Sequence, residues 1–124
     1  MSTKKNILIV DDSASVRQVV GISLRQAGYD VMEGHDGKDA LSKLTGQKVH
    51  LIISDVNMPN LDGIGLVKAV KAMPAYKFTP IVMLTTESQD AKKREGQAAG
   101  AKAWIVKPFK PDQLLGVVQK LVLP

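Results

Sequence analysis

The sequence predicts an α/β protein with a doubly wound parallel five-stranded sheet, built from five consecutive strand–helix units, (βα)5. Three observations lead to this fold class. Short apolar runs without polar alternation recur along the chain, as in parallel strands that are covered on both faces. Apolar residues at helical spacing lie between the runs, and glycines follow several of these stretches. The length of 124 residues suits one compact core, so we expect a single domain over residues 1–124.

Five apolar runs predict the strands, in chain order. They are Ile7–Val10, Val31–Met32, Val49–Ile53, Pro80–Leu84 and Ala103–Val106. The second run is short, and only Gly34 follows it where the other runs lead to polar side chains. We therefore expect the second strand at an edge of the sheet.

Apolar stripes predict the helices between these strands. The stripes are Val16, Val19, Val20 and Leu24; Ala40, Leu41 and Leu44; Leu66, Val67, Val70 and Met73; and Leu114, Val117, Val118 and Leu121. A fourth helix, residues 88–99, has helical propensity but offers the core mainly Ala91, Ala98 and Ala99. Gly28, Gly46 and Gly100 are expected to end the first, second and fourth helices, and Pro111 to begin the fifth.

Composition argues against several classes of function. The net charge is +5, but the lysines are scattered and only 4% of residues are aromatic, which favours a solvated surface over a nucleic-acid site. There is no cysteine, which excludes disulfides and thiolate metal sites. The first apolar run, Ile7–Val10, is too short for a signal peptide or a membrane segment. We therefore expect a cytoplasmic protein.

Polar side chains follow four of the five predicted strands. They are Asp11 and Asp12 after the first, Asp55 after the third, Thr85, Thr86 and Glu87 after the fourth, and Lys107 after the fifth. Open α/β sheets bind ligands outside the carboxyl ends of their strands. We therefore expect these side chains to form one site.

The residue types in this site indicate phosphoryl chemistry. Three carboxylates brought together repel one another unless a cation neutralises them. Oxygen ligands, with no cysteine in the chain and no histidine nearby in sequence, suit Mg²⁺. A magnesium ion beside a lysine and a hydroxyl can bind a phosphoryl group, and a carboxylate there can act as the nucleophile and form an aspartyl phosphate.

Each residue also has a simpler interpretation. The pair Asp11–Asp12 could merely begin a helix, where the helix dipole favours negative charge. Thr85 and Thr86 could cap the fourth helix, and Lys107 could be a surface lysine whose alkyl stem covers apolar residues. Polar side chains follow four strand ends that the predicted fold brings to one edge, which favours a common site over four unrelated structural roles. Structural or solvated roles are assigned to His35, His50, Met58 and Asp62, the last as the start of the third helix.

Four segments carry a family resemblance. In this order, ILIVDDS, SDVNMPNLDG, MLTTES and WIVKPF resemble the receiver domain of two-component response regulators, over essentially the whole chain. The NMPN stretch is similar to chemotaxis-type, CheY-like single-domain members. The resemblance implies a flavodoxin-like fold with strand order 2-1-3-4-5.

The resemblance also implies a role for each site residue. Asp55 would accept phosphate from a phosphohistidine of a sensor histidine kinase, with Mg²⁺ as cofactor. The implied metal ligands are Asp12, Asp11 through water, Asp55 and the backbone carbonyl of Asn57. The implied phosphoryl contacts are Thr85, Lys107 and the backbone at Asn57 and Thr86. Asn57 and Glu87 would set the rate of hydrolysis, and the Lys107–Pro108 bond would be cis.

The implied switch residues are Thr85 and Trp104. The family usually has tyrosine or phenylalanine where this chain has Trp104, whose indole is larger and carries a donor N–H. Trp104 could instead be a packed strand residue that takes no part in switching.

The function expected from the resemblance is that of a phosphoacceptor switch in chemotaxis. It would catalyse only its own phosphotransfer and dephosphorylation, and would not be an enzyme for other substrates. We expect a monomer without a DNA-binding domain, whose downstream protein binds the fourth helix, fifth strand and fifth helix. One alternative is a Mg²⁺-dependent phosphohydrolase of the haloacid-dehalogenase type, which would need an Asp-x-Asp pair after the first strand. Another is a flavodoxin-type carrier, for which the loop DDSAS is too acidic.

Overall fold

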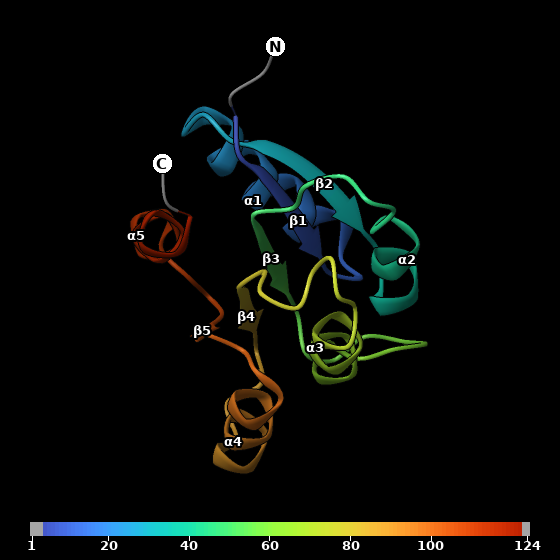
Figure 1. Cartoon of the computed structure of the whole chain (residues 1–124). Helices are drawn as coiled ribbons and strands as arrows, with labels where there is room; N and C mark the ends of the chain where they lie inside the picture. The colour runs from blue at the N-terminus through green and yellow to red at the C-terminus, as the bar shows by residue number, and fades with distance from the viewer. Residues whose placement is uncertain (1–3, 123–124) are drawn as a thin grey trace.

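The computed structural model describes residues 4–122, which alternate five strands with five helices (Figure 1). The elements are β1 (Asn6–Val10), α1 (Ala14–Gln26), β2 (Asp30–Gly34), α2 (Gly37–Ser42), β3 (Leu51–Ser54), α3 (Gly63–Lys71), β4 (Ile81–Thr85), α4 (Asp90–Ala99), β5 (Ala103–Val106) and α5 (Pro111–Leu121). The predicted (βα)5 order is confirmed. No helix in this part of the chain is both long and apolar enough to cross a membrane.

The five strands form one parallel sheet in the order β2-β1-β3-β4-β5. β2 lies at one edge, as predicted from the absence of polar side chains after its apolar run. The order reverses at β1, which pairs with β2 on one side and with β3 on the other. The loops after β1 and β3 therefore diverge, which leaves the crevice where ligands bind in this architecture.

Helices cover both faces of the sheet. α1 and α5 lie over one face, and α2, α3 and α4 lie over the other (Figure 1). Along β1, Ile7 and Ile9 belong to the core cluster beneath α1 and α5, whereas Leu8 and Val10 belong to the cluster beneath the other three helices. Both faces are thus buried, which explains why the strands are continuous apolar runs.

Three details of the predicted helices are wrong. Val19 is 54% exposed, because the residues of α1 that are buried, Val20, Gly21 and Leu24, turn Val19 to the edge of the buried stripe. α2 ends at Ser42, four residues before the predicted stop at Gly46. α4 begins at Asp90 and not at residue 88.

The weak anchoring of α4 is confirmed, but of its three predicted contacts only Ala99 packs against the core. Ala91 and Ala98 are exposed, and Ala99 is only partly buried. The one buried residue of α4 is Gly96, which lies against the ring of Trp104. A Cβ atom at Gly96 would come within 2.8 Å of Trp104 Cζ3, so this contact requires glycine.

Candidate functional site

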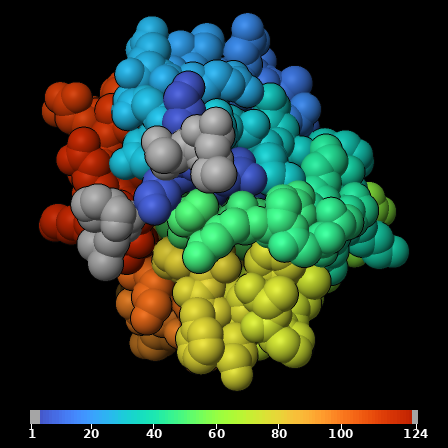
Figure 2. Space-filling model, turned by 45° about the horizontal axis from the view of Figure 1, so that its top comes forward, coloured from blue at the N-terminus to red at the C-terminus, as the bar shows by residue number. Residues whose placement is uncertain are grey.

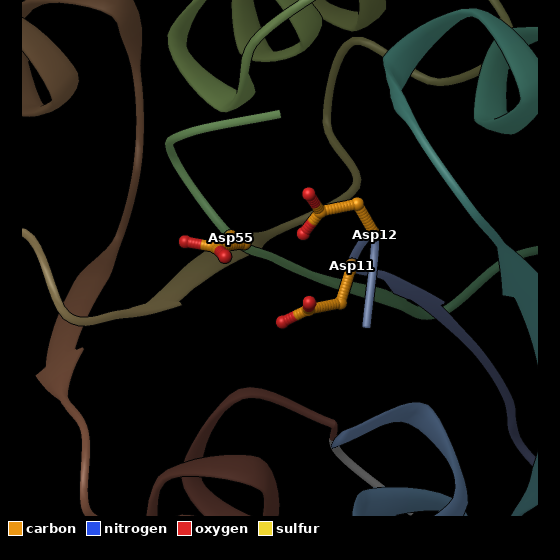
Figure 3. A group of neighbouring side chains, drawn as sticks. All are labelled: Asp11, Asp12 and Asp55. Carbon is orange, nitrogen blue, oxygen red and sulfur yellow. The ribbon is translucent and has the colours of Figure 1, made fainter. Parts of the chain in front are cut away.

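Three carboxylates meet at the carboxyl edge of the sheet. Asp11 and Asp12 follow β1, Asp55 follows β3, and Figure 3 shows their side chains close together. One oxygen from each carboxylate lies within 4.8 Å of one from each of the others. Asp11 and Asp55 are buried, whereas Asp12 is exposed. The predicted convergence of these residues is confirmed.

Backbone hydrogen bonds fix Asp55 at the end of the sheet. Its N–H donates to the carbonyl of Val10 at 2.9 Å, which continues the β1–β3 pairing by one residue. Its carboxylate Oδ1 accepts from the N–H of Val56 at 2.7 Å. The side chain is therefore held in place by its own strand end, while Oδ2 faces the other charged groups.

Asp11 is fixed from the other side of the crevice. Its Oδ1 accepts from the N–H of Ser13 at 2.9 Å, and its carbonyl accepts from Arg17 Nη1 at 2.6 Å. Ser13 itself caps α1 by accepting from the N–H of Val16. The helix start is thus organised by Ser13, which leaves Asp12 free to point into the site. The sequence pattern did not indicate a role for Ser13 or Arg17 in this region.

Lys107 brings a positive charge to the cluster. Its Nζ lies 2.8 Å from Asp11 Oδ2 and 3.5 Å from Asp55 Oδ2, and its side chain is 15% exposed. The interpretation of Lys107 as a surface lysine is therefore wrong. Its backbone N–H donates to the carbonyl of Thr85, and the Lys107–Pro108 bond is cis, as the resemblance implied.

One ammonium does not neutralise three carboxylates. Burial raises the pKa of Asp11 above its ordinary value, and the charge of Asp55 acts in the same direction. The contacts from Lys107 and from the Ser13 N–H lower this pKa but do not cancel the effect of burial. The arrangement is therefore suited to a further cation. Because its ligands are all oxygens, a hard cation such as Mg²⁺ fits the residues present.

The hydroxyl of Thr85 belongs to a contact chain that reaches α4. Thr85 ends β4, beside β3, and its Oγ1 accepts from the N–H of Glu87 at 3.1 Å. The carbonyl of Glu87 accepts from Trp104 Nε1 at 2.9 Å. The indole ring then packs on Gly96. The resemblance implied a link between Thr85 and Trp104, but the roles of the Glu87 carbonyl and of Gly96 were missed.

The remaining predicted residues lie around this site. Asn57 and Thr86 have exposed side chains in the loops after β3 and β4, so the roles of their backbone groups stay predictions. α4 begins after Gln89, so Thr85 and Thr86 do not cap it. Structural or solvated roles are confirmed for exposed His35, for His50 Nδ1 as acceptor of the Asn6 N–H, for Met58 against the core, and for Asp62 as N-cap of α3.

Comparisons with known proteins agree with this geometry. The sequence model of the response regulator receiver domain family matches residues 7–119. The chain is 40% identical over 110 residues to chemotaxis protein CheY1 of Helicobacter pylori, covering 87% of this chain and 89% of that protein. It is 33% identical over 113 residues to protein PilG of Pseudomonas aeruginosa, covering 91% and 84%. Among solved structures, chemotaxis protein CheY4 of Vibrio cholerae is 50% identical with a TM-score of 0.91, covering 96% of this chain and 99% of that one.

Proposed function

Because the chain belongs to the receiver-domain family of two-component response regulators, we propose that it is a chemotaxis-type phosphorelay switch that accepts phosphate on Asp55. One observation carries this proposal. The carboxylate of Asp55 lies at the end of a central strand, with two further carboxylates and the ammonium of Lys107 beside it. The similarity to chemotaxis proteins supports the signalling context.

The chemistry follows from the charges at this site. A carboxylate oxygen of Asp55 attacks phosphorus, the bond from phosphorus to the donor histidine nitrogen breaks, and the electron pair leaves with the imidazole. A Mg²⁺ ion held by Asp11, Asp12, Asp55 and the carbonyl of Asn57 would offset charge on the phosphoryl oxygens.

The chain's own donors would receive the transferred group. Lys107 exchanges its contacts with Asp11 and Asp55 for a phosphoryl oxygen, because its ammonium is a mobile point charge. The hydroxyl of Thr85 and the backbone N–H groups of Asn57 and Thr86 donate to the remaining oxygens. The side chains of Asn57 and Glu87 would influence the approach of the hydrolytic water, as the family resemblance implies.

Phosphorylation would shift an equilibrium between two conformations. When the Thr85 hydroxyl turns to the phosphoryl group, it gives up its contact with the N–H of Glu87, whose carbonyl holds Trp104. The ring of Trp104 lies against Gly96, the one buried residue of α4, so a movement of Trp104 would reach this weakly anchored helix. The proposed binding surface for a downstream protein is therefore α4, β5 and α5. We further propose that the protein acts as a cytoplasmic monomer and catalyses only its own phosphotransfer and dephosphorylation.

Radiolabelled acetyl phosphate with Mg²⁺ tests the proposal. The wild type should take up an acid-stable, base-labile label, and Asp55→Asn should abolish it. The matched control is Asp62→Asn in the same β3–α3 loop, which should label like the wild type because Asp62 only caps α3. Persistent labelling of the Asp55 variant would refute the assignment. Turnover of an unrelated phosphomonoester would favour the phosphohydrolase alternative.

A further inference from the structure

A cavity of about 450 Å³ opens near the amino-terminal end of β3, away from the carboxylates. It lies between the loop that precedes β3, residues 46–50, and the loop that precedes β4, residues 75–80. Figure 2 shows this face, where the green and yellow segments lie against each other. The volume is in the range of small-molecule sites. The phosphoacceptor chemistry described above uses none of these residues.

Hydrogen bonds between the two loops brace the cavity. The hydroxyl of Tyr76, a buried residue, donates to the carbonyl of Gln47 and accepts from the N–H of Gly46, both at 2.8 Å. The hydroxyl of Thr79 donates to the carbonyl of Val49 at 3.3 Å. Five hydrogen-bonding groups of the walls are thus already paired, and these bonds tie the two loops to each other. A ligand would meet a formed site.

The lining combines an apolar surface with cationic and N–H donors. Phe78 is 86% exposed, and Val49 and Pro80 continue the apolar wall. Within residues 4–122, the ammonium of Lys48 has no hydrogen bond or ion pair, although it lines the cavity. None of the lining residues is acidic.

His50 supplies a second donor. Its Nδ1 accepts the N–H of Asn6 at 3.0 Å, so the neutral ring carries its proton on Nε2. Burial lowers the pKa of His50, and the charges of Lys5 and Lys48 lower it further. Those two lysines make the surroundings of His50 positive. Lys77, whose ammonium lies 5.0 Å from the centre of the Phe78 ring, adds a third positive charge beside the apolar wall.

We propose that this cavity binds a small organic anion with a flat apolar body, the chemical class to which nucleoside phosphates belong. The flat body lies against Phe78 and the neighbouring apolar wall. The anionic group lies at Lys48 and at the Nε2–H of His50. Such a ligand gives the ammonium of Lys48 a partner, which it lacks among residues 4–122, and covers the exposed ring of Phe78.

Titration with ADP, followed by amide NMR shifts, tests the site. Mg²⁺-free buffer with EDTA keeps phosphate from binding through metal at the carboxylates. We expect ADP to shift amides within residues 46–50 and 75–80, and to bind more tightly than adenosine, which lacks the anion, or pyrophosphate, which lacks the ring. Lys48→Gln and Phe78→Ala should each weaken ADP binding about fivefold or more. Lys68→Gln, an exposed lysine on α3, should not.

Three outcomes would overturn the proposal. The first is the absence of shifts at ADP concentrations of about 10 mM, beyond any useful affinity. The second is equal affinity for ADP and pyrophosphate, which would mean that the positive charges attract any anion and that the apolar wall does not contribute to binding. The third is a set of shifts confined to residues 11–12 and 55–57. Since Phe78 and Lys48 are exposed, their variants should fold, and unchanged thermal unfolding would verify this. Asp55→Asn should bind ADP as the wild type does, which separates this site from the phosphoacceptor.

Discussion

Asp11 and Asp36 are two buried carboxylates, 2% and 3% exposed, that follow neighbouring strands at the same edge of the sheet, yet their pKa values move in opposite directions. The pKa of Asp36 is lowered, first because it accepts from the Asp39 N–H at 2.8 Å and then because it accepts from the Asn60 amide at 2.7 Å. The pKa of Asp11 is raised because burial outweighs its contacts with Lys107 and Ser13.

The difference separates a structural carboxylate from one that is kept for a ligand. Asp36 begins α2 and ties it to the β3–α3 loop through Asn60, so the fold itself supplies its donors. Asp11 shares a single ammonium with Asp55, and Asp12 adds a third negative charge. Charge that the fold leaves uncompensated is characteristic of functional sites, where stability is reduced for the sake of binding.

The largest expected effect is on the free energy of unfolding, which Asp36→Ala and Asp55→Asn should change in opposite directions. Asp36→Ala removes the N-cap of α2 and leaves the Asn60 amide without its acceptor, so it should lower the folding equilibrium constant about tenfold. Asp55→Asn keeps an acceptor oxygen and removes one of three like charges, so in Mg²⁺-free buffer it should stabilise the fold. Urea denaturation measures both. Two changes of the same sign would mean that the carboxylate cluster carries no strain.

The same contrast explains what could be predicted from the sequence. Asp55 and Lys107 could be placed because each directly follows an apolar run, and parallel strands bring such positions to one edge. The burial of Asp36 could not be predicted. Its neighbours His35 and Gly37 suggest an ordinary turn, and its partner Asn60 lies 24 residues away.

The packing of the helices on the rest of the domain also could not be predicted from the sequence pattern. Helical spacing predicted Val19, Val20 and Leu24 as core residues of α1, but only Val20 and Leu24 are buried, and Val19 is exposed. For α4, the pattern indicated alanines as anchors, but only Ala99 packs against the core, and the buried contact is Gly96 on Trp104. A glycine inside a helix is unfavourable by about 1 kcal/mol relative to alanine, which is a signal of close approach that could have indicated this contact.

Magnesium affinity should distinguish Asp12 from another acidic residue at this edge. Asp12→Ala removes a ligand and a negative charge, so it should weaken Mg²⁺ binding about tenfold or more. Asp62→Ala also removes an exposed negative charge at the carboxyl edge, but this residue only accepts from the Gly65 N–H, so Mg²⁺ affinity should stay within about twofold. Titration calorimetry compares the two. Equal losses would mean that the metal responds to overall charge and not to a defined ligand.

The stability contributions of Asp36 and Asp39 should change with pH in the direction opposite to that of Asp11. Asp36 and Asp39 ordinarily titrate near 3.8 and have lowered pKa values in the fold, the latter mainly through the His35 N–H. Their stabilising effect is complete above that pH and is lost as pH falls through the lower folded pKa. Asp11 has a raised pKa, so its contribution to stability decreases as pH rises from 3.8 through that value.

Urea denaturation over a series of pH values measures these contributions. Asp36→Asn should flatten the loss of stability below pH 3.8, and Asp11→Asn should make stability rise more steeply above it. Mg²⁺ must be absent, since bound metal would stabilise the ionised form of Asp11. Identical pH profiles for the two variants would contradict the contrast between these carboxylates.

The smallest expected effect concerns Trp104, which shares features with the structural carboxylate Asp36 and with the functional site around Asp11. Its indole N–H is satisfied by the Glu87 carbonyl, like the structural carboxylates, but its ring is only partly buried and rests on the weakly anchored α4. If it responds to the site, beryllofluoride with Mg²⁺ should shift its emission slightly to the blue, because further burial removes water from the indole. Trp104 is the only tryptophan, so the signal is unambiguous.

Two variants test the origin of this shift. Asp55→Asn should abolish the shift, and Thr85→Ala should reduce it because the hydroxyl that contacts the Glu87 N–H is gone. An unchanged spectrum, with beryllofluoride binding verified separately, would place Trp104 with Asp36 as a structural residue and leave the transmission of the signal to other contacts of α4.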